Sequence, residues 1–315
     1  MRWYVPIGII VLSLVFSGVY IRTHRQTPAL TPKVTSVYQE KAHAWQATFD
    51  SDGISTAYGL FLQSGKKMTY DDAHDLAHIV GQILYAKLGD VGISVCTPDF
   101  GFGCYHAVVG AALIDRGLDA VTQLGKECKS STADSSIQFG CIHGIGHGIL
   151  AYVGNARLAE ALKQCAPIQG DGMDERIGGC LGGVFMEYNF RTMQSLNGTD
   201  LRPYDAAQFE EPCATEVPES FKLACYYEQA SWWRASMSSK EISMTETIAK
   251  VGKLCLRVKN AEWRDMCFRG IGNTIGPNSE YKADMMRTWC QSMPDDHAFA
   301  LCYREALGHL LHVGN

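Results

Sequence analysis

The sequence has no excess of basic residues and few charged residues in total. Lys and Arg number 28 against 33 Asp and Glu, the net charge is −5, and only 19% of the 315 residues are charged. A nucleic-acid surface needs clustered basic charge, and a disordered chain needs more charge and fewer apolar residues than the 46% found here. We therefore expect a globular core and no nucleic-acid partner.

Strand signals and the common catalytic motifs are also missing. No Asn-Gly or Asp-Gly turn is flanked by alternating β-branched residues, so β-hairpins are not expected. The sequence has no nucleophile elbow, phosphate-binding loop or dinucleotide fingerprint. Helical patterns fill the chain instead. Amphipathic segments with helical periodicity lie at 118–128, 157–165, 246–255 and 282–290, and apolar segments rich in small residues lie at 105–114, 143–153 and 268–275.

The twelve cysteines form six close pairs, none of them with the Cys-x-x-Cys spacing of zinc ribbons or haem attachment. An even number of cysteines in evenly spaced pairs favours structural disulfides and an oxidising compartment over free buried thiols. Each bridge would close a loop worth about 3 kcal/mol. Nearest-neighbour pairing predicts Cys96–Cys104, Cys128–Cys141, Cys165–Cys180, Cys213–Cys225, Cys255–Cys267 and Cys290–Cys302.

The second cysteine of each pair opens a similar segment, and these openings recur at intervals of 37, 39, 45, 42 and 35 residues. Such intervals suit helical hairpins, and Asp72 takes the cysteine's place in an additional upstream unit. We predict an all-α fold of about seven disulfide-linked helical hairpins, forming an α/α solenoid or a closed toroid. Gly144-Ile-Gly-His147-Gly148 resembles a Gly-x-x-His-Gly motif of lanthionine cyclases, which have a seven-hairpin barrel. The resemblance covers those five residues and the repeat count, and the disulfide-paired cysteines argue against carrying over that activity.

The N-terminus contains a long apolar run, from Trp3 to Ile21. Its 19 residues can span a bilayer as a helix, so residues 1–26 are predicted to be an uncleaved signal anchor, with a cleaved signal peptide as the alternative. Arg22 and Arg25 after the span favour a cytoplasmic body by the positive-inside rule, whereas the paired cysteines favour an extracytoplasmic one. We give the cysteines more weight. Residues 27–39 are predicted to be a tether, and residues 40–315 the repeat domain.

Histidines recur at matched positions of the predicted repeats. His74 and His78 share one helix face, as do His143 and His147, because residues four apart lie side by side on a helix. His106 holds the corresponding position in the unit between them. Adjacent helix axes are about 8–10 Å apart, so these imidazoles are expected to meet around one or two ions. With Glu187 from the next unit, they form a candidate site for zinc, iron, copper or manganese.

Two function classes follow. In the first, the histidine set binds a transition metal that activates water or oxygen for a small-molecule or peptide substrate. In the second, the chain is a non-enzymatic scaffold for a peptide, glycan or partner protein, and its histidines are structural. Arg269 and Arg304 occupy the histidine position in later units and are candidates for an anion-binding rim, or else ion-pair with acidic neighbours such as Glu305.

Overall fold

The computed structural model describes residues 36–131, 134–170, 172, 176–193 and 200–313. Most of these residues lie in helices, and no strand occurs among them. The helices are α2 (Ser36–Asp52), α3 (Ile54–Gly65), α4 (Tyr70–Leu88), α5 (Gly103–Arg116), α6 (Ala120–Ser130), α7 (Ser135–Val153), α8 (Leu158–Gln164), α10 (Gly179–Phe190), α11 (Lys222–Met237), α12 (Met244–Arg257), α13 (Ala261–Asn278), α14 (Ala283–Cys290) and α15 (Asp296–Val313).

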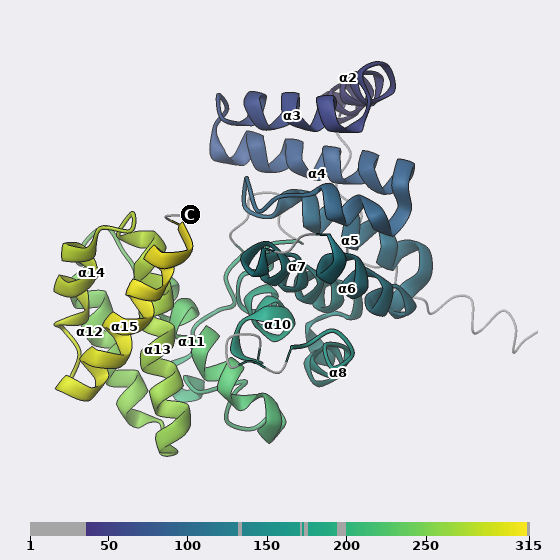
Figure 1. Ribbon diagram of the computed structural model, residues 1–315. Coiled ribbons are helices and arrows are strands. Elements are labelled where there is room, and N and C mark those ends of the chain that lie inside the picture. The colour runs from purple at the N-terminus through teal and green to yellow at the C-terminus, as the bar shows by residue number, and fades with distance from the viewer. Residues whose placement is uncertain (1–35, 132–133, 171, 173–175, 194–199, 314–315) are drawn as a thin grey trace, which may run out of the picture.

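The helices that begin at or near the opening positions pack against one another in chain order. Helix α4 packs on α5, α5 on α7, α7 on α10, α10 on α11, α11 on α13 and α13 on α15. Helices α6, α8, α12 and α14, which coincide with the predicted amphipathic segments, pack beside this series. Figure 1 shows the chain progressing from α2 and α3 at one end to α14 and α15 at the other.

Local sequence signals set the ends of the site-bearing helices. Thr69 caps α4 by accepting a hydrogen bond from the backbone N–H of Asp72 at 3.2 Å. Asp134 caps α7 by accepting from the backbone N–H of Ser136 at 2.8 Å. Helix α7 ends at Gly154, whose φ of +88° is costly for residues with a side chain.

Two glycines allow α7 and α10 to approach closely. A Cβ atom on Gly146 would lie 2.0 Å from the carbonyl oxygen of Cys180, and one on Gly183 would lie 2.0 Å from the carbonyl oxygen of His143. Neither distance is compatible with a side chain, so the contact depends on glycine at both positions. This close packing brings Glu187 of α10 against the histidines of α7.

All six predicted disulfides are confirmed, with Cα–Cα distances of 5.6–5.8 Å. The second cysteine of each bridge lies in a helix of the packed series, such as Cys141 in α7 and Cys180 in α10. The described residues contain no free cysteine. Each bridge therefore anchors the beginning of one of these helices to the segment that precedes it, and the disulfides indicate an oxidising extracellular or periplasmic location.

Apolar side chains form two core clusters. The first contains residues between Phe49 and Tyr227, together with Val258 and Met266. The second contains Phe209 and residues between Ala230 and Ala306. Helix α2 begins at Ser36, so residues 36–39 of the predicted tether are helical. The predicted anchor, residues 1–26, lies outside the described residues. Among the residues that are described, no helix has the length and apolar character needed to cross a bilayer.

Candidate metal centre

The fold gathers the predicted histidines along three successive helices. Helix α4 carries His74 and His78, α5 carries His106, and α7 carries His143 and His147. Helix α5 packs against both α4 and α7, and α10 packs against α7 from another direction. The five imidazoles form a row across α4, α5 and α7, and Glu187 of α10 lies beside its α7 end.

The first pair of histidines points two ring nitrogens at each other. The Nε2 atoms of His74 and His78 are 3.1 Å apart. His74 Nδ1 lies 2.8 Å from the backbone carbonyl oxygen of Phe100, and because a carbonyl can only accept, Nδ1 carries the proton. In the neutral ring, Nε2 of His74 therefore has its lone pair directed toward His78. This is the tautomer that a metal ligand needs.

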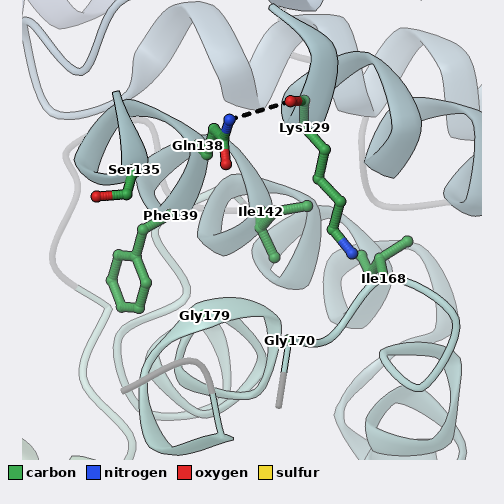
Figure 2. A pocket seen from close by; sticks show the side chains of 8 residues that line it. All are labelled: Lys129, Ser135, Gln138, Phe139, Ile142, Ile168, Gly170 and Gly179. Carbon is green, nitrogen blue, oxygen red and sulfur yellow. Dashed lines mark hydrogen bonds between the residues drawn. The ribbon is translucent and has the colours of Figure 1, made fainter. Parts of the chain in front are cut away.

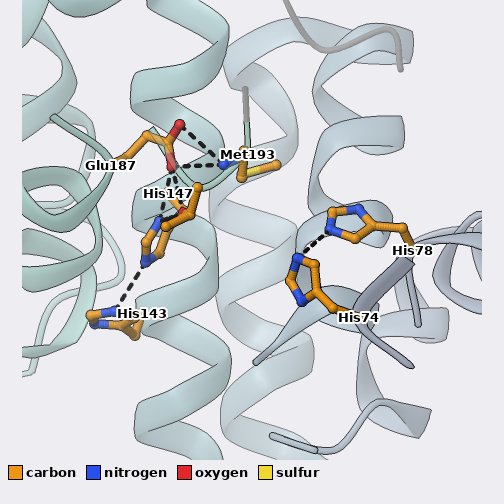
Figure 3. Close-up of polar contacts among 7 residues, drawn as sticks. His74, His78, His143, His147, Glu187 and Met193 are labelled. Carbon is orange, nitrogen blue, oxygen red and sulfur yellow. Dashed lines mark hydrogen bonds and ion pairs between the residues drawn. The ribbon is translucent and has the colours of Figure 1, made fainter. Parts of the chain in front are cut away.

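The second pair repeats this arrangement on α7. The Nε2 atoms of His143 and His147 are also 3.1 Å apart. His147 Nδ1 lies 3.1 Å from Glu187 Oε2, so the carboxylate accepts its proton and leaves the lone pair on Nε2. Figure 3 shows the pair His143 and His147 on one side of the view and the pair His74 and His78 on the other, with Glu187 above His147.

Glu187 is completely buried and already has several hydrogen-bond donors. The backbone N–H of Met193 donates to Oε2 at 3.0 Å and the hydroxyl of Thr192 donates at 2.8 Å. With His147 added, this carboxylate resembles the outer-shell acceptor that orients a metal-binding histidine more than it resembles a ligand. Glu187 was predicted from the sequence to be a metal ligand, and in the structure its carboxylate contacts the Nδ1 of His147.

His106 lies between the two pairs. Its ring centroid is 5.7 Å from that of His78 and 5.0 Å from that of His147. The side chain is 3% exposed, yet neither ring nitrogen has a hydrogen-bond partner among the described residues. Leaving a buried polar atom without a partner costs about 1–3 kcal/mol. A ligand that bonds to these nitrogens would remove that cost.

His74, His78 and His106 could together hold a metal ion. One nitrogen from each ring lies within 4.8 Å of the others, and the described residues contain no other group of three such ligands. Two nitrogens bound to one tetrahedral zinc are about 3.3 Å apart, given bonds of about 2.0–2.1 Å. The 3.1 Å between His74 and His78 is close to that value, so the third ring needs only a small inward movement.

Three of the histidines, His78, His106 and His143, are held in the neutral form that binds metals. Burial lowers the pKa of His78 to about 3, with a further decrease from the neighbouring His74. Burial and the neighbouring His147 have the same effect on His143, whose pKa is about 3. The pKa of His106 is well below its usual value, first because of burial and then because of the surrounding histidines. At neutral pH these three rings offer lone pairs without having to lose a proton.

The later arginines occupy different surroundings. Arg269 Nε donates to Glu305 Oε2 at 2.7 Å, and the hydroxyl of Tyr227 donates to the other oxygen of the same carboxylate at 2.8 Å. Arg269 is thus ion-paired, as the alternative interpretation of the sequence anticipated. Arg304 is exposed. Anion binding by either residue stays a prediction.

Sequence reasoning missed the relation between Glu228 and the histidine row. Glu228 of α11 is 2% exposed, its Oε2 has no hydrogen-bond partner among the described residues, and burial raises its pKa to about 8. A Cβ atom on Gly182 would lie 3.1 Å from Glu228 Oε1 and 3.4 Å from His143 Nδ1. Gly182, which aligns with His74, His106 and His143 in the predicted repeat, thus lets a carboxyl group approach the end of the row. In the sequence, the glycine at position 182 was the signal that could have predicted the approach of Glu228 to His143.

A small hollow of about 90 Å³ adjoins the same end of the row. Figure 2 shows its lining, in which Gln138 donates a hydrogen bond to the carbonyl oxygen of Lys129 at 3.0 Å. Phe139 belongs to this lining, and its ring stacks on His143 at a centroid distance of 6.4 Å. The hollow is roomy enough for several water molecules, and none of the five histidines lines it.

The chain matches no known protein-family model, no curated protein and no solved structure.

Proposed function

We propose that this chain is a membrane-anchored, extracytoplasmic helical-repeat protein whose histidine row binds a divalent transition metal, and that the metal activates water or oxygen. One observation carries the metal assignment. His74, His78 and His106 bring three ring nitrogens within 4.8 Å of one another, and the most buried of the three has no hydrogen-bond partner among the described residues. Three protein ligands leave a coordination position open for water or substrate.

The tautomers support binding rather than a purely structural role. His74 and His147 each commit Nδ1–H to an acceptor, which leaves Nε2 for a metal. Zinc, iron, copper and manganese all accept imidazole nitrogen. The hollow beside His143 supplies room for a small substrate, or for one side chain of a peptide, near the row.

The repeat architecture is part of the proposal. The packing of α4, α5, α7, α10, α11, α13 and α15 in chain order, with a disulfide at the beginning of most of them, fits a stack of about seven helical hairpins. A stack of this kind places equivalent positions of neighbouring units side by side. That arrangement explains why histidines that are about 35 residues apart in the sequence lie next to one another in space.

The location rests on the disulfides and on the apolar N-terminus. Six bridges require an oxidising compartment, and the run from Trp3 to Ile21 would hold the protein at the membrane. Protease added to intact cells, or to spheroplasts where an outer membrane exists, should digest the body. A protected body with reduced cysteines would place it in the cytoplasm instead.

Metal content tests the central claim. Full-length protein purified from an oxidising compartment should contain a transition metal by elemental analysis, and chelated protein should rebind Zn²⁺. His106→Ala removes one ligand and should therefore weaken Zn²⁺ binding. His297→Ala is the control: it removes a histidine that pairs with Asp265 far along the chain, and it should leave Zn²⁺ binding unchanged. If the purified protein lacks metal and does not bind Zn²⁺, the metal function fails and a scaffold with structural histidines replaces it.

The scaffold alternative has one observation in its favour. Two neutral imidazoles with nitrogens 3.1 Å apart can also share an N–H···N hydrogen bond, as His143 and His147 do here. Such bonds would make the pairs structural. In that case replacing His78 and His143 would destabilise the fold equally with and without added Zn²⁺, whereas a metal site predicts that Zn²⁺ stabilises only the wild-type protein.

A further inference from the structure

The two histidine pairs are alike, and His106 lies between them. Each pair joins Nε2 atoms 3.1 Å apart, and in each pair one rear nitrogen is committed to an acceptor. His106 differs from the histidines on either side because both of its ring nitrogens lack a hydrogen-bond partner among the described residues. An imidazole has its two nitrogens on different edges of the ring. One metal site accounts for only one of them.

Ring separations place His106 near both rings of the first pair and near His147 of the second. Among the described residues His143 makes no close ring contact with His106, so the second site closes around an ion only if these rings move inward. Two imidazoles bound to one tetrahedral metal have centroids about 5 Å apart, because each centroid lies about 3.2 Å from a metal at a bond length of about 2.0–2.1 Å. The observed separations are 4.7 Å within the first pair and 4.9 Å within the second. His106 lies 5.7 and 5.9 Å from the rings of the first pair and 5.0 Å from His147.

We propose that His106 bridges two metal ions through its two ring nitrogens, one ion held by His74 and His78 and the other by His143 and His147. This inference rests on the proposed metal function and specifies it as a dinuclear centre. The ring gives up its remaining N–H proton to solvent as the second ion binds, so that each nitrogen offers a lone pair. The two ions would then be about 6 Å apart, given the ring width and the bond length.

The surrounding charge supports two cations. Glu187 is completely buried beside His147. Glu228 is buried near His143 across Gly182; its raised pKa of about 8 keeps it protonated at neutral pH, and it becomes an anion only when a nearby cation lowers that pKa. Buried cations are tolerated when anionic groups lie close to them. A bridging imidazolate contributes a further negative charge between the two ions.

Copper(II) provides a probe that separates the possible outcomes. Two Cu²⁺ ions linked by one imidazolate couple magnetically, so chelated full-length protein should take up two Cu²⁺ per chain and lose most of its low-temperature EPR intensity when the second ion binds. His106→Ala should restore the signal of isolated ions. Added imidazole should enter the space left by the ring and remove that signal again. His297→Ala should behave as the wild type does.

Different results would overturn the metal function and the bridging role of His106. No Cu²⁺ or Zn²⁺ binding by the wild type would overturn the metal function itself. One Cu²⁺ per chain, with uptake unchanged in the His143→Ala/His147→Ala double variant, would leave the metal function intact and overturn the bridge. Two Cu²⁺ per chain with the full signal of isolated ions would also overturn the bridge. The wild-type stoichiometry and spectrum decide these cases even if His106→Ala does not fold.

Discussion

Replacing Gly183 with alanine tests whether the close packing of α7 and α10 positions the histidine row. The new Cβ would lie 2.0 Å from the carbonyl oxygen of His143 and 3.0 Å from the backbone nitrogen of His147. Nonbonded contacts normally begin above about 3 Å, so the two helices must separate by roughly 1 Å. Helix α10 carries Glu187, whose 3.1 Å contact with His147 would lengthen beyond hydrogen-bonding distance.

The size of the effect follows from three contributions. Overpacking a tight contact costs about 1–3 kcal/mol. Weakening the charged hydrogen bond between Glu187 and His147 costs about 1.5–3 kcal/mol. Alanine recovers about 1 kcal/mol of helix propensity. We expect Gly183→Ala to lower the free energy of unfolding by about 2–4 kcal/mol. Because His147 loses its orienting carboxylate, metal binding that involves the His143 and His147 pair should weaken about 10–100-fold.

Urea denaturation followed by circular dichroism measures the first effect, and Zn²⁺ titration measures the second. The matched control is Gly59→Ala in α3, where an added Cβ meets no atom within 4 Å. That variant should gain about 0.5–1 kcal/mol and bind Zn²⁺ as the wild type does. A Gly183→Ala protein as stable as wild type, with unchanged Zn²⁺ affinity, would refute the role of this contact.

Three further predictions concern bridges and buried charges. Cys165→Ala/Cys180→Ala opens a loop that joins residues 15 apart and should lower the free energy of unfolding by about 3 kcal/mol in urea titrations. In metal-free protein, His78 and His143 have pKa values of about 3, below those of the unfolded chain, so stability is fully present above pH 6.5 and is lost as the pH falls toward 3. The loss approaches about 1.4 kcal/mol per pH unit for each ring, less screening by solvent, and urea midpoints that do not change between pH 7 and 5 would contradict it. The effect of pH on Glu228 runs the other way, because burial raises its pKa to about 8. Its contribution to the free energy of unfolding is present at about pH 4.5 and is lost as the pH rises to about 8. Glu228→Gln should therefore be more stable than the wild type at about pH 8 and not at about pH 4.5.

The sequence was sufficient to predict the helices, the bridges and which histidines meet. Cysteine spacing determined the pairing, because each bridge joins neighbours in the chain and needs no knowledge of distant contacts. The i, i+4 rule placed His143 beside His147, and the predicted alignment of the units placed His106 near His147. The sequence could not show that the rings would form a row instead of surrounding one point, since that depends on helix offsets of a few ångströms.

The role of Glu187 depended on a loop that carries no recognisable motif. Thr192 and Met193 follow α10 and turn back to donate hydrogen bonds to its carboxylate. These contacts use most of the acceptor capacity of Glu187 and direct the remainder toward His147. A sequence pattern identifies a carboxylate near histidines as a possible ligand. Only the positions of its donors show that it is better suited to orient a ligand.

Glu228 shows why Gly182, which aligns with histidines of other units in the predicted repeat, is informative. Units with histidine there place a ring between neighbouring helices, whereas Gly182 leaves that space to side chains from both sides. His143 approaches from α7 and Glu228 from α11, and the burial that raises the pKa of Glu228 follows from this approach. A cation bound at His143 would counteract that shift, since a nearby positive charge stabilises the carboxylate. If a second metal ion binds at His143 and His147 as proposed, Glu228 on α11 should become ionised.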